Sequence, residues 1–238
     1  AEIYKFQNNI KNAIVCYEKI LDLSPNDCIA LYNMGVIYQS INDFDVALKL
    51  YTKSIEIKPN FYQAFCNLGI IYQVKGESNL SILNYEKALS INPDYPDALN
   101  NLATVYKEQG NVSLSIQLYQ KAIKILPTFS NAAYNLGIAF QEVGLYQNAI
   151  KAYENAIELD PLRQESYNNL GNILQEIGEL EDAINLFRKS LSINNNYAES
   201  HYNLGNALFE KDNINESIKS YKKALKLNNN YPEAYSNL

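Results

Sequence analysis

The tetrapeptide Tyr134-Asn135-Leu136-Gly137 decides the fold of this chain, because its asparagine returns every 34 residues. The other residues in this register are Asn33, Asn67, Asn101, Asn169, Asn203 and Asn237. The same shift aligns prolines and an aromatic series, with no gap or insertion. A period of this length is typical of stacked supersecondary units, each of which contacts only its neighbours. The 238 residues are therefore predicted to form one linear array.

The repeat boundaries follow when the proline is placed at position 32, which makes Cys28 position 1 of the first complete repeat. The complete repeats are residues 28–61, 62–95, 96–129, 130–163, 164–197 and 198–231, with partial repeats at 1–27 and 232–238. Terminal units of solenoids normally carry an atypical, polar sequence. Because both ends cut through the repeat, we expect the chain to be a fragment of a longer one.

Each repeat carries the pattern of two helices. Apolar residues at positions 4, 7, 8 and 11 form one helical face, and a second helical pattern covers positions 17 to 30. Glycine, asparagine or aspartate at position 15 tolerates the left-handed conformation that ends a helix.

The joints between helices are also predicted. Small residues at positions 8 and 20 should bring the two helices together, and the aromatic residue at 24 should fill the joint to the next repeat. Proline at 32 should end the second helix, as should its replacements Asn195 and Asn229.

This combination resembles the tetratricopeptide repeat family: leucine or tyrosine at position 4, leucine at 7, glycine at 8, tyrosine at 11 and 24, alanine at 20 and 27, and proline at 32. The resemblance covers the whole chain. It implies an all-α fold in which antiparallel helix pairs wind into a right-handed α-α superhelix. It also implies that the first helix of each pair lines a concave groove.

Four positions of the first helix lie opposite its packing face when residues are placed at 100° intervals: 2, 6, 9 and 13. In the family geometry they face the groove and are the candidate peptide-binding positions. The candidate residues are Asn33, Asn67, Asn101, Asn135, Asn169, Asn203, Ile29, Val36, Ile70, Val74, Glu142, Glu165, Asn172, Glu176, Glu199, Asn206 and Glu210.

These positions change from apolar in the first repeats to acidic and amide in the last. We therefore expect a protein or peptide partner that offers apolar groups to the first repeats and basic groups to the last, since carboxylates attract cations. The alternative is that the glutamates are only a solvated helix face.

The asparagine row also has two interpretations. A carboxamide is both donor and acceptor, so the row could hold the backbone of an extended peptide whatever its side chains. Alternatively, each asparagine bonds across to the helix of the next repeat, or is simply common to this family of repeats.

Composition excludes several classes of partner. A net charge of −6 argues against nucleic acid, which is bound by basic surfaces. No apolar run reaches the ~18 to 20 residues that span a bilayer, so no membrane association is expected. Cys16, Cys28 and Cys66 have neither disulfide-framework nor zinc spacing, which agrees with a reducing, cytoplasmic location.

Catalysis is not expected, and neither is a cofactor or metal. The single histidine, His201, occupies packing position 4, and no nucleophile with a nearby base can be assembled around it. The glycines form neither a phosphate-binding loop nor a dinucleotide motif, and helix contacts explain them.

Two functions remain open. The first is a protein-interaction scaffold that binds an extended peptide or a partner helix. The second is the substrate-recognition arm of a nucleocytoplasmic protein glycosyltransferase, because the unbroken asparagines resemble those of O-GlcNAc transferase and SPINDLY arms. Chaperone-binding members of the family carry lysine or arginine at positions 2 and 13, and this chain does not. The ends near Tyr4 and Leu238 could also stack end to end.

Overall fold

The computed structural model describes residues 10–237, and in that range it contains fourteen helices and no strands. The helices are α2 (Ile10–Leu23), α3 (Cys28–Ser40), α4 (Phe44–Ile57), α5 (Tyr62–Val74), α6 (Ser78–Ile91), α7 (Pro96–Glu108), α8 (Val112–Ile125), α9 (Ser130–Glu142), α10 (Tyr146–Leu159), α11 (Gln164–Glu176), α12 (Leu180–Ile193), α13 (Ala198–Glu210), α14 (Ile214–Leu227) and α15 (Pro232–Ser236). The expected contact site at the two ends, near Tyr4 and Leu238, lies outside the described residues.

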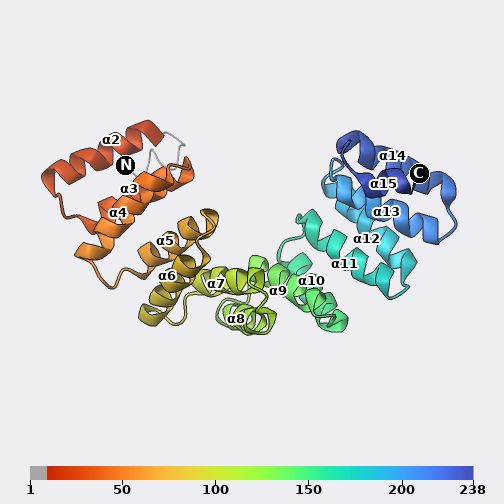
Figure 1. Cartoon of the computed structure of the whole chain (residues 1–238), viewed down its shortest axis with the longest axis horizontal. Coiled ribbons are helices and arrows are strands. Elements are labelled where there is room, and N and C mark those ends of the chain that lie inside the picture. The colour runs from red at the N-terminus through yellow and green to blue at the C-terminus, as the bar shows by residue number, and fades with distance from the viewer. Residues whose placement is uncertain (1–9, 238) are drawn as a thin grey trace. The chain divides into compact units, whose positions relative to one another are not determined.

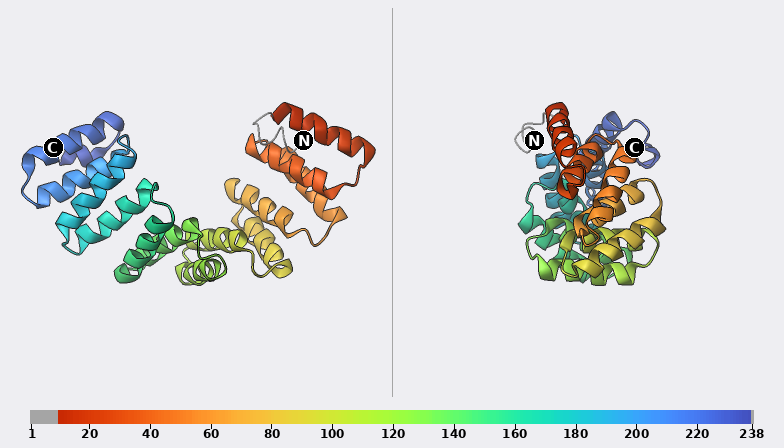
Figure 2. Two further views of the ribbon diagram at one scale, coloured as in Figure 1. Left: turned by 180° about the vertical axis from the view of Figure 1, so that it is seen from behind. Right: turned by 90° about the vertical axis from the view of Figure 1, so that its left-hand side faces the viewer.

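The fold is the all-α solenoid of helix pairs that the sequence predicts. In each complete repeat the helices cover positions 1 to 13 and 17 to 30, and a short turn makes them antiparallel (Figures 1 and 2). Contacts divide the chain into two compact units, Ala1–Leu114 and Ser115–Leu238, with the boundary inside α8. The single continuous array stays a prediction. Within residues 10–237, no helix is long and apolar enough to cross a membrane.

The predicted turn at position 15 is confirmed by its backbone angles. Asn42 and Asp212 have φ values of 61° and 60°, and glycine with positive φ occupies the position in four other repeats. Glycine adopts this conformation without steric cost, and Asn and Asp tolerate it better than most residues. The turn therefore reverses the chain at the same place in each of these repeats.

The second helix ends in the same way with proline or asparagine at position 32. In the two repeats where asparagine replaces this proline, the side chain at position 31 accepts a backbone hydrogen bond. Asn194 accepts from the N–H of Asn196 at 3.0 Å, and Asn228 accepts from that of Asn230 at 3.1 Å. Asp160 does the same before Pro161, accepting from Leu162 at 3.3 Å. Such side-chain turns compete with further helix. The residue at position 31 therefore helps to end these helices.

The two helices of a pair meet at the glycine of position 8. A β-carbon added to Gly137 would lie 2.6 Å from the Tyr153 ring, and Gly69, Gly171 and Gly205 face the position-24 ring of their own repeats equally closely. The aromatic residue at 24 thus packs within its own pair, whereas the sequence analysis assigned it only to the joint with the next repeat. The expected contact of position 20 with position 8 is present, because Ser81 Oγ donates to the Gly69 carbonyl at 2.9 Å.

Candidate functional site

The position-6 asparagines connect successive repeats. Asn67 Nδ2 donates to the Tyr32 hydroxyl of the preceding repeat at 3.3 Å, and Asn169 Nδ2 donates to the Tyr134 hydroxyl at 3.2 Å. Each bond joins position 6 to position 5 of the previous first helix. It forms because neighbouring first helices stack side by side, which brings these two positions together.

Asn203 is the most enclosed of the position-6 residues. Its Nδ2 donates to Asn168 Oδ1 at 3.0 Å, and Ser200 Oγ donates to the same oxygen at 2.8 Å. Asn168 and Asn203 are both buried. The expectation that position 6 lies away from the packing surface is therefore wrong for Asn203. Asn33, Asn101 and Asn135 are half-buried.

The glutamines of position 12 link the first helix of a repeat to its second helix. The hydroxyls of Tyr51, Tyr85 and Tyr153 donate to Oε1 of Gln39, Gln73 and Gln141 at 2.7, 3.1 and 2.9 Å, respectively. Burial raises the pKa of all three hydroxyls, so they remain protonated donors at neutral pH.

The position-13 glutamates receive hydrogen bonds from the preceding repeat. Gln73 Nε2 lies 3.4 Å from Glu108 Oε1, and Gln175 Nε2 donates to Glu210 Oε1. The Tyr146 hydroxyl donates to Glu176, and this bond raises the pKa of Tyr146. These exposed carboxylates are thus oriented by uncharged partners from the preceding repeat.

A first hollow lies in the unit of residues 115–238 and is lined by amides and carboxylates. Its volume is about 470 Å³. The lining residues are Gln141, Asn172, Gln175, Glu176 and Glu210. Among the described residues that line it, none is basic. Positions 9, 12 and 13 of α9, α11 and α13 therefore form an acidic surface on the first-helix side of this unit.

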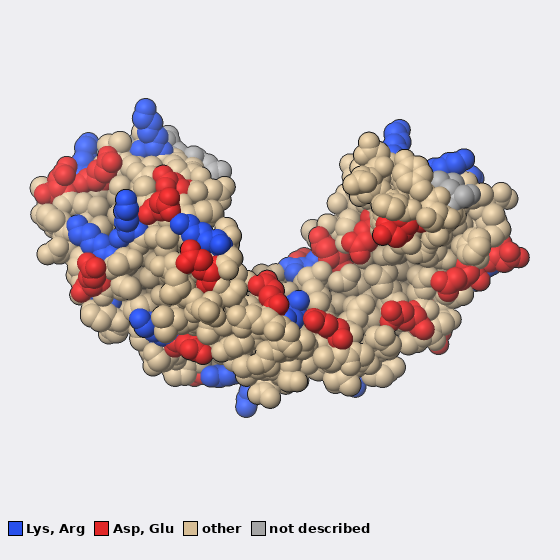
Figure 3. Space-filling model, viewed as in Figure 1, with Lys and Arg blue, Asp and Glu red and all other residues tan. Residues whose placement is uncertain are grey.

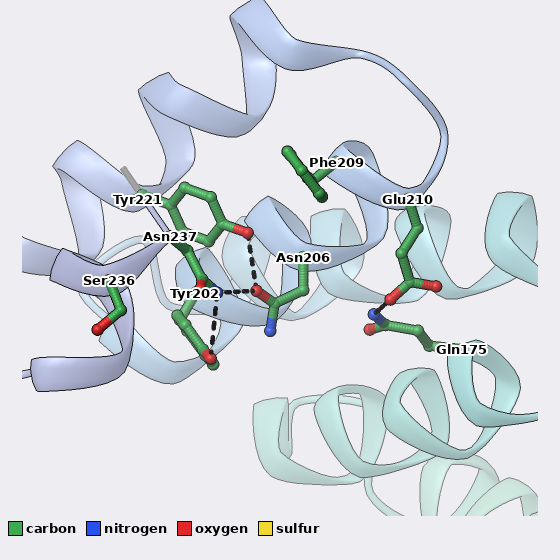
Figure 4. A pocket seen from close by; sticks show the side chains of 8 residues that line it. All are labelled: Gln175, Tyr202, Asn206, Phe209, Glu210, Tyr221, Ser236 and Asn237. Atoms are coloured by element: carbon green, nitrogen blue, oxygen red, sulfur yellow. Dashed lines mark hydrogen bonds between the residues drawn. The ribbon is translucent and has the colours of Figure 1, made fainter.

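A second hollow of about 490 Å³ adjoins the first, because Gln175 and Glu210 line both. Its lining residues are Gln175, Tyr202, Asn206, Phe209, Glu210, Tyr221, Ser236 and Asn237 (Figure 4). Figure 4 shows Gln175 and Glu210 facing one another on one side, with Asn206, Tyr202 and Asn237 on the other. This hollow is more aromatic than the first.

Phe209 changes the bonding pattern of the repeat 198–231. It occupies position 12, where four other repeats have glutamine. Because phenylalanine cannot accept a hydrogen bond, the Tyr221 hydroxyl donates instead to Asn206 Oδ1 at 2.8 Å. Asn237 Nδ2 donates to the same oxygen at 3.1 Å. The Phe209 ring is 57% exposed.

The apolar candidates lie in the unit of residues 1–114. Ile29 and Val74 are 56% and 62% exposed. Val36 is half-buried against the cluster of Tyr51 and its neighbours, and Ile70 is also half-buried. Of the four apolar candidates, Ile29 and Val74 are therefore the ones that are open to solvent.

The remaining candidate glutamates differ in how strongly they are held. Glu199 accepts hydrogen bonds from Asn168 Nδ2 and from the Tyr197 hydroxyl, both at 3.0 Å. Glu165 accepts from the neighbouring Gln164 at 2.9 Å, and Glu142 is exposed. Neither Glu165 nor Glu199 lines the two hollows.

The sequence analysis missed the aromatic pairs that positions 5 and 34 form in two repeats. Tyr32 packs against Phe61, and Tyr202 packs against Tyr231, with tilted rings whose centroids are 4.8 Å apart in both pairs. The signal was present in the sequence, because position 34 is aromatic in five of the six complete repeats: Phe61, Tyr95, Phe129, Tyr197 and Tyr231. The exception is Arg163, whose guanidinium carbon lies 5.0 Å from the Tyr134 ring centroid.

His201 is a packed ring, as predicted. It is buried, its Nε2 lies 3.1 Å from the Asn195 carbonyl oxygen, and burial lowers its pKa. Within residues 10–237, no three His, Cys, Asp or Glu side chains form a group that could hold a metal ion.

Surface charge is mixed on the face shown in Figure 3. Acidic and basic side chains alternate there without gathering into one basic area. Some ion pairs join neighbouring repeats, as Lys75 does with Asp45 at 2.6 Å. Such exposed pairs add little stability.

Stacked antiparallel helix pairs with polar hollows on the first-helix side define an α-solenoid of the protein-interaction class. Family models described as "Tetratricopeptide repeat" match residues 28–61, 96–129 and 130–161, residues 50–82 and 152–185, and residues 1–27. A model described as "TPR repeat" matches residues 74–110, 171–212 and 205–238. The chain belongs to the tetratricopeptide repeat family, whose arrays typically bind other proteins.

Solved structures share this fold. MamA is 27% identical with a TM-score of 0.64, and the match covers 72% of this chain and 94% of MamA. PilF of Pseudomonas aeruginosa is 18% identical with a TM-score of 0.80, covering 88% and 95%. YrrB, described as a TPR protein with an unusual peptide-binding site, is 20% identical with a TM-score of 0.66, covering 78% and 96%.

No curated protein matches the chain. The comparisons give no support to the expected likeness to glycosyltransferase arms.

Proposed function

We propose that this chain is a non-catalytic, cytoplasmic scaffold that binds an extended peptide along the first helices of its repeats. The unit of residues 115–238 binds basic groups, and the unit of residues 1–114 binds apolar groups. The observation that carries the proposal is the pair of adjoining hollows whose shared wall is formed by Gln175 and Glu210.

Charge supports a basic partner. Glu176 and Glu210 lie in the hollows without a basic side chain among the described lining residues. Because both carboxylates are oriented by hydrogen bonds from neighbouring repeats, little side-chain entropy is lost when a cation binds. A cationic group thus gains attraction without first displacing an internal salt bridge.

The asparagine row is proposed to have a second role in holding the peptide backbone. The amide nitrogens of Asn67 and Asn169 are used between repeats. A carboxamide oxygen has two lone pairs, so it can still accept a peptide N–H. This contact would not depend on the side chains of the peptide.

The proposal is tested with an array of ten-residue peptides and the 238-residue chain. Basic peptides with apolar residues are expected to bind best, and affinity is expected to fall as salt screens the glutamates. Charge reversal by Glu176→Lys with Glu210→Lys should abolish the preference for basic peptides.

The matched control is Glu154→Lys with Glu158→Lys, which reverses two exposed charges on the second helix α10. This control should bind the same peptides as the original chain. Preferential binding of acidic peptides, or an unchanged salt dependence in the groove variant, would overturn the proposal. A triple variant with Asn101, Asn135 and Asn169 changed to alanine tests the role of the asparagines. If this variant folds and binds the peptides with unchanged affinity, the asparagines have no part in binding.

A further inference from the structure

We propose that the outer side of α14 binds a short acidic segment of a partner protein through Lys219, Lys222, Lys223 and Lys226. We call these four residues the lysine stripe. The stripe lies on a second helix, so it is a different surface from the first-helix face of the proposed function, and it selects the opposite charge. The inference therefore does not depend on the groove.

The four lysines share one face of α14. They occupy positions 22, 25, 26 and 29 of the repeat, a spacing of i, i+3, i+4 and i+7 that places them in one line along a helix. Lys219, Lys222 and Lys226 are exposed, and Lys223 is half-buried. Residues 217–227 contain no aspartate or glutamate. The stripe is therefore a line of one charge, about 10 Å long at the rise of an α-helix.

The exposure of these positions does not depend on where the chain ends. In α10, which has complete repeats on both sides, the same positions hold Lys151, Glu154, Asn155 and Glu158. Three of these residues are exposed and Asn155 is half-buried, which is the same pattern as in α14. A neighbouring repeat thus leaves the outer side of the second helix open.

The stripe has no carboxylate partner among the described residues. Ion pairs join neighbouring repeats elsewhere, as Arg188 of α12 does with Glu216 of α14 at 3.0 Å, but none includes a lysine of the stripe. Like charges three or four residues apart on a helix repel each other and weaken the helix. The helix dipole favours Lys226 in the last turn, but Lys219 lies about two turns earlier. Folding therefore does not account for this line of charge.

A surface that is only solvated has no need for a single sign of charge. At the same four positions α10 carries one lysine and two glutamates, and α4 carries two lysines and one glutamate. No other described second helix has more than two basic residues there. Because the whole chain has a net charge of −6, the stripe is a local reversal of sign. Charge complementarity then favours an acidic partner.

An acidic protein segment fits the stripe better than a membrane or a nucleic acid. Four residues of an extended chain span about 10 Å, so a run of aspartates or glutamates matches the length of the stripe. Binding to a lipid surface depends on apolar side chains that enter it, and residues 217–227 expose none of large size. A long nucleic acid would extend beyond the stripe onto a chain of negative net charge.

The test is fluorescence anisotropy of labelled peptides with the 238-residue chain. One peptide has four consecutive glutamates in a neutral serine-glycine sequence, and the second has glutamines in their place. At low ionic strength the glutamate peptide is expected to bind about tenfold more tightly than the glutamine peptide. The difference should shrink as salt screens the charges.

Two double variants with the same residue spacing and the same change in net charge locate the site. Lys222→Glu with Lys226→Glu should lower the affinity for the glutamate peptide about tenfold. Lys49→Glu with Lys53→Glu, at exposed positions of α4, is the control and should change it less than about twofold. Circular dichroism checks the helix content of both. If charge reversal impairs folding, Lys222→Gln with Lys226→Gln should still lower the affinity.

Several outcomes would overturn the inference. Equal losses in the two double variants would show that only net charge matters, and full binding by the α14 variant would place the peptide elsewhere. Phosphatidylserine vesicles and single-stranded DNA are tested on the same variants. If either binds the stripe more tightly than the glutamate peptide, the partner is not an acidic protein segment.

The α14 variant also separates this inference from the proposed function. Acidic array peptides that this variant no longer binds belong to the stripe, and they leave the groove proposal standing. Acidic array peptides that it still binds in preference to basic ones contradict the groove proposal. If basic peptides bind and the glutamate peptide does not, only the lysine stripe is wrong.

Discussion

The side-chain nitrogen of Asn67 lies 3.1 Å from the hydroxyl oxygen of Tyr51 in the preceding repeat, and 3.3 Å from that of Tyr32. The Tyr51 hydroxyl in turn donates to Gln39 at 2.7 Å. One asparagine thus connects both helices of the previous repeat to its own first helix. The residue that marks the repeat in the sequence is also a polar tie between repeats.

Removing this tie should lower stability. Asn67→Ala is expected to reduce the free energy of unfolding by about 1 to 2 kcal/mol, because two partly buried tyrosine hydroxyls lose a donor. Urea denaturation followed by circular dichroism measures the change. Asn79→Ala, at an exposed position of α6, is the control and should cost less than about 0.5 kcal/mol. Equal effects of the two variants would contradict a structural role for Asn67.

A methyl group at Gly137 should also destabilise the chain. In a helix, Gly→Ala is ordinarily stabilising by about 0.5 to 1 kcal/mol. Here the new β-carbon would meet the Tyr153 ring at 2.6 Å, so overpacking is expected to reverse the sign and cost about 1 kcal/mol or more.

Thermal melting compares Gly137→Ala with the double variant Gly137→Ala, Tyr153→Leu. The double variant should lose less stability than the sum of its single changes, because the clash is then absent. Strict additivity would show that the ring is not the cause.

Ser166 offers a stabilising substitution. Its hydroxyl is fully buried and has no hydrogen-bond partner. In the following repeat the equivalent of Ser166 is Ser200, whose hydroxyl pairs with that of Ser190 at 2.8 Å. For Ser166 the residue equivalent to Ser190 is Ala156, which has no hydroxyl. Ser166→Ala is expected to raise the free energy of unfolding by about 1 kcal/mol, since an unpaired buried hydroxyl is removed.

Chemical denaturation tests this expectation, and Ser200→Ala serves as the opposite case. Because Ser200 donates to Asn168 Oδ1 at 2.8 Å, its removal should destabilise the chain. A loss of stability in Ser166→Ala would mean that its hydroxyl is in fact satisfied.

The Cys66 thiol should resist modification in the folded chain. Burial raises its pKa to about 12 from an ordinary value of 9.0, so almost no thiolate forms at pH 8. A thiol-reactive disulfide reagent should label Cys66 only after denaturation, as peptide mass spectrometry would show. Rapid labelling of the native chain at pH 8 would contradict this burial.

The same shift predicts a pH dependence of stability. The pKa of the Cys66 thiol is higher in the folded chain than in the unfolded chain. The contribution of this thiol to the free energy of unfolding is therefore complete below pH 9 and is lost as the pH rises from about 9 towards 12. In Cys66→Ala this contribution is absent. Unfolding free energies measured between pH 8 and 11 should therefore fall less steeply in the variant.

The helices could be predicted from sequence because they depend on local, repeated information. The 34-residue register placed both helices of each repeat, and it placed the turn that Asn42 and Asp212 occupy with positive φ. Backbone preferences and apolar spacing act within a few residues, so they can be read along the chain.

The partners of the polar side chains required the tertiary structure. Asn203 was expected on the open face, yet it is buried against Asn168, 35 residues earlier. The Phe209 hollow also combines residues from α11 to α15. Helical spacing gives only the direction of a side chain around its own helix. Which groups meet there is decided by how the neighbouring repeat stacks, because the stacking closes some polar positions, such as Asn203, and leaves others, such as Glu176, open to solvent.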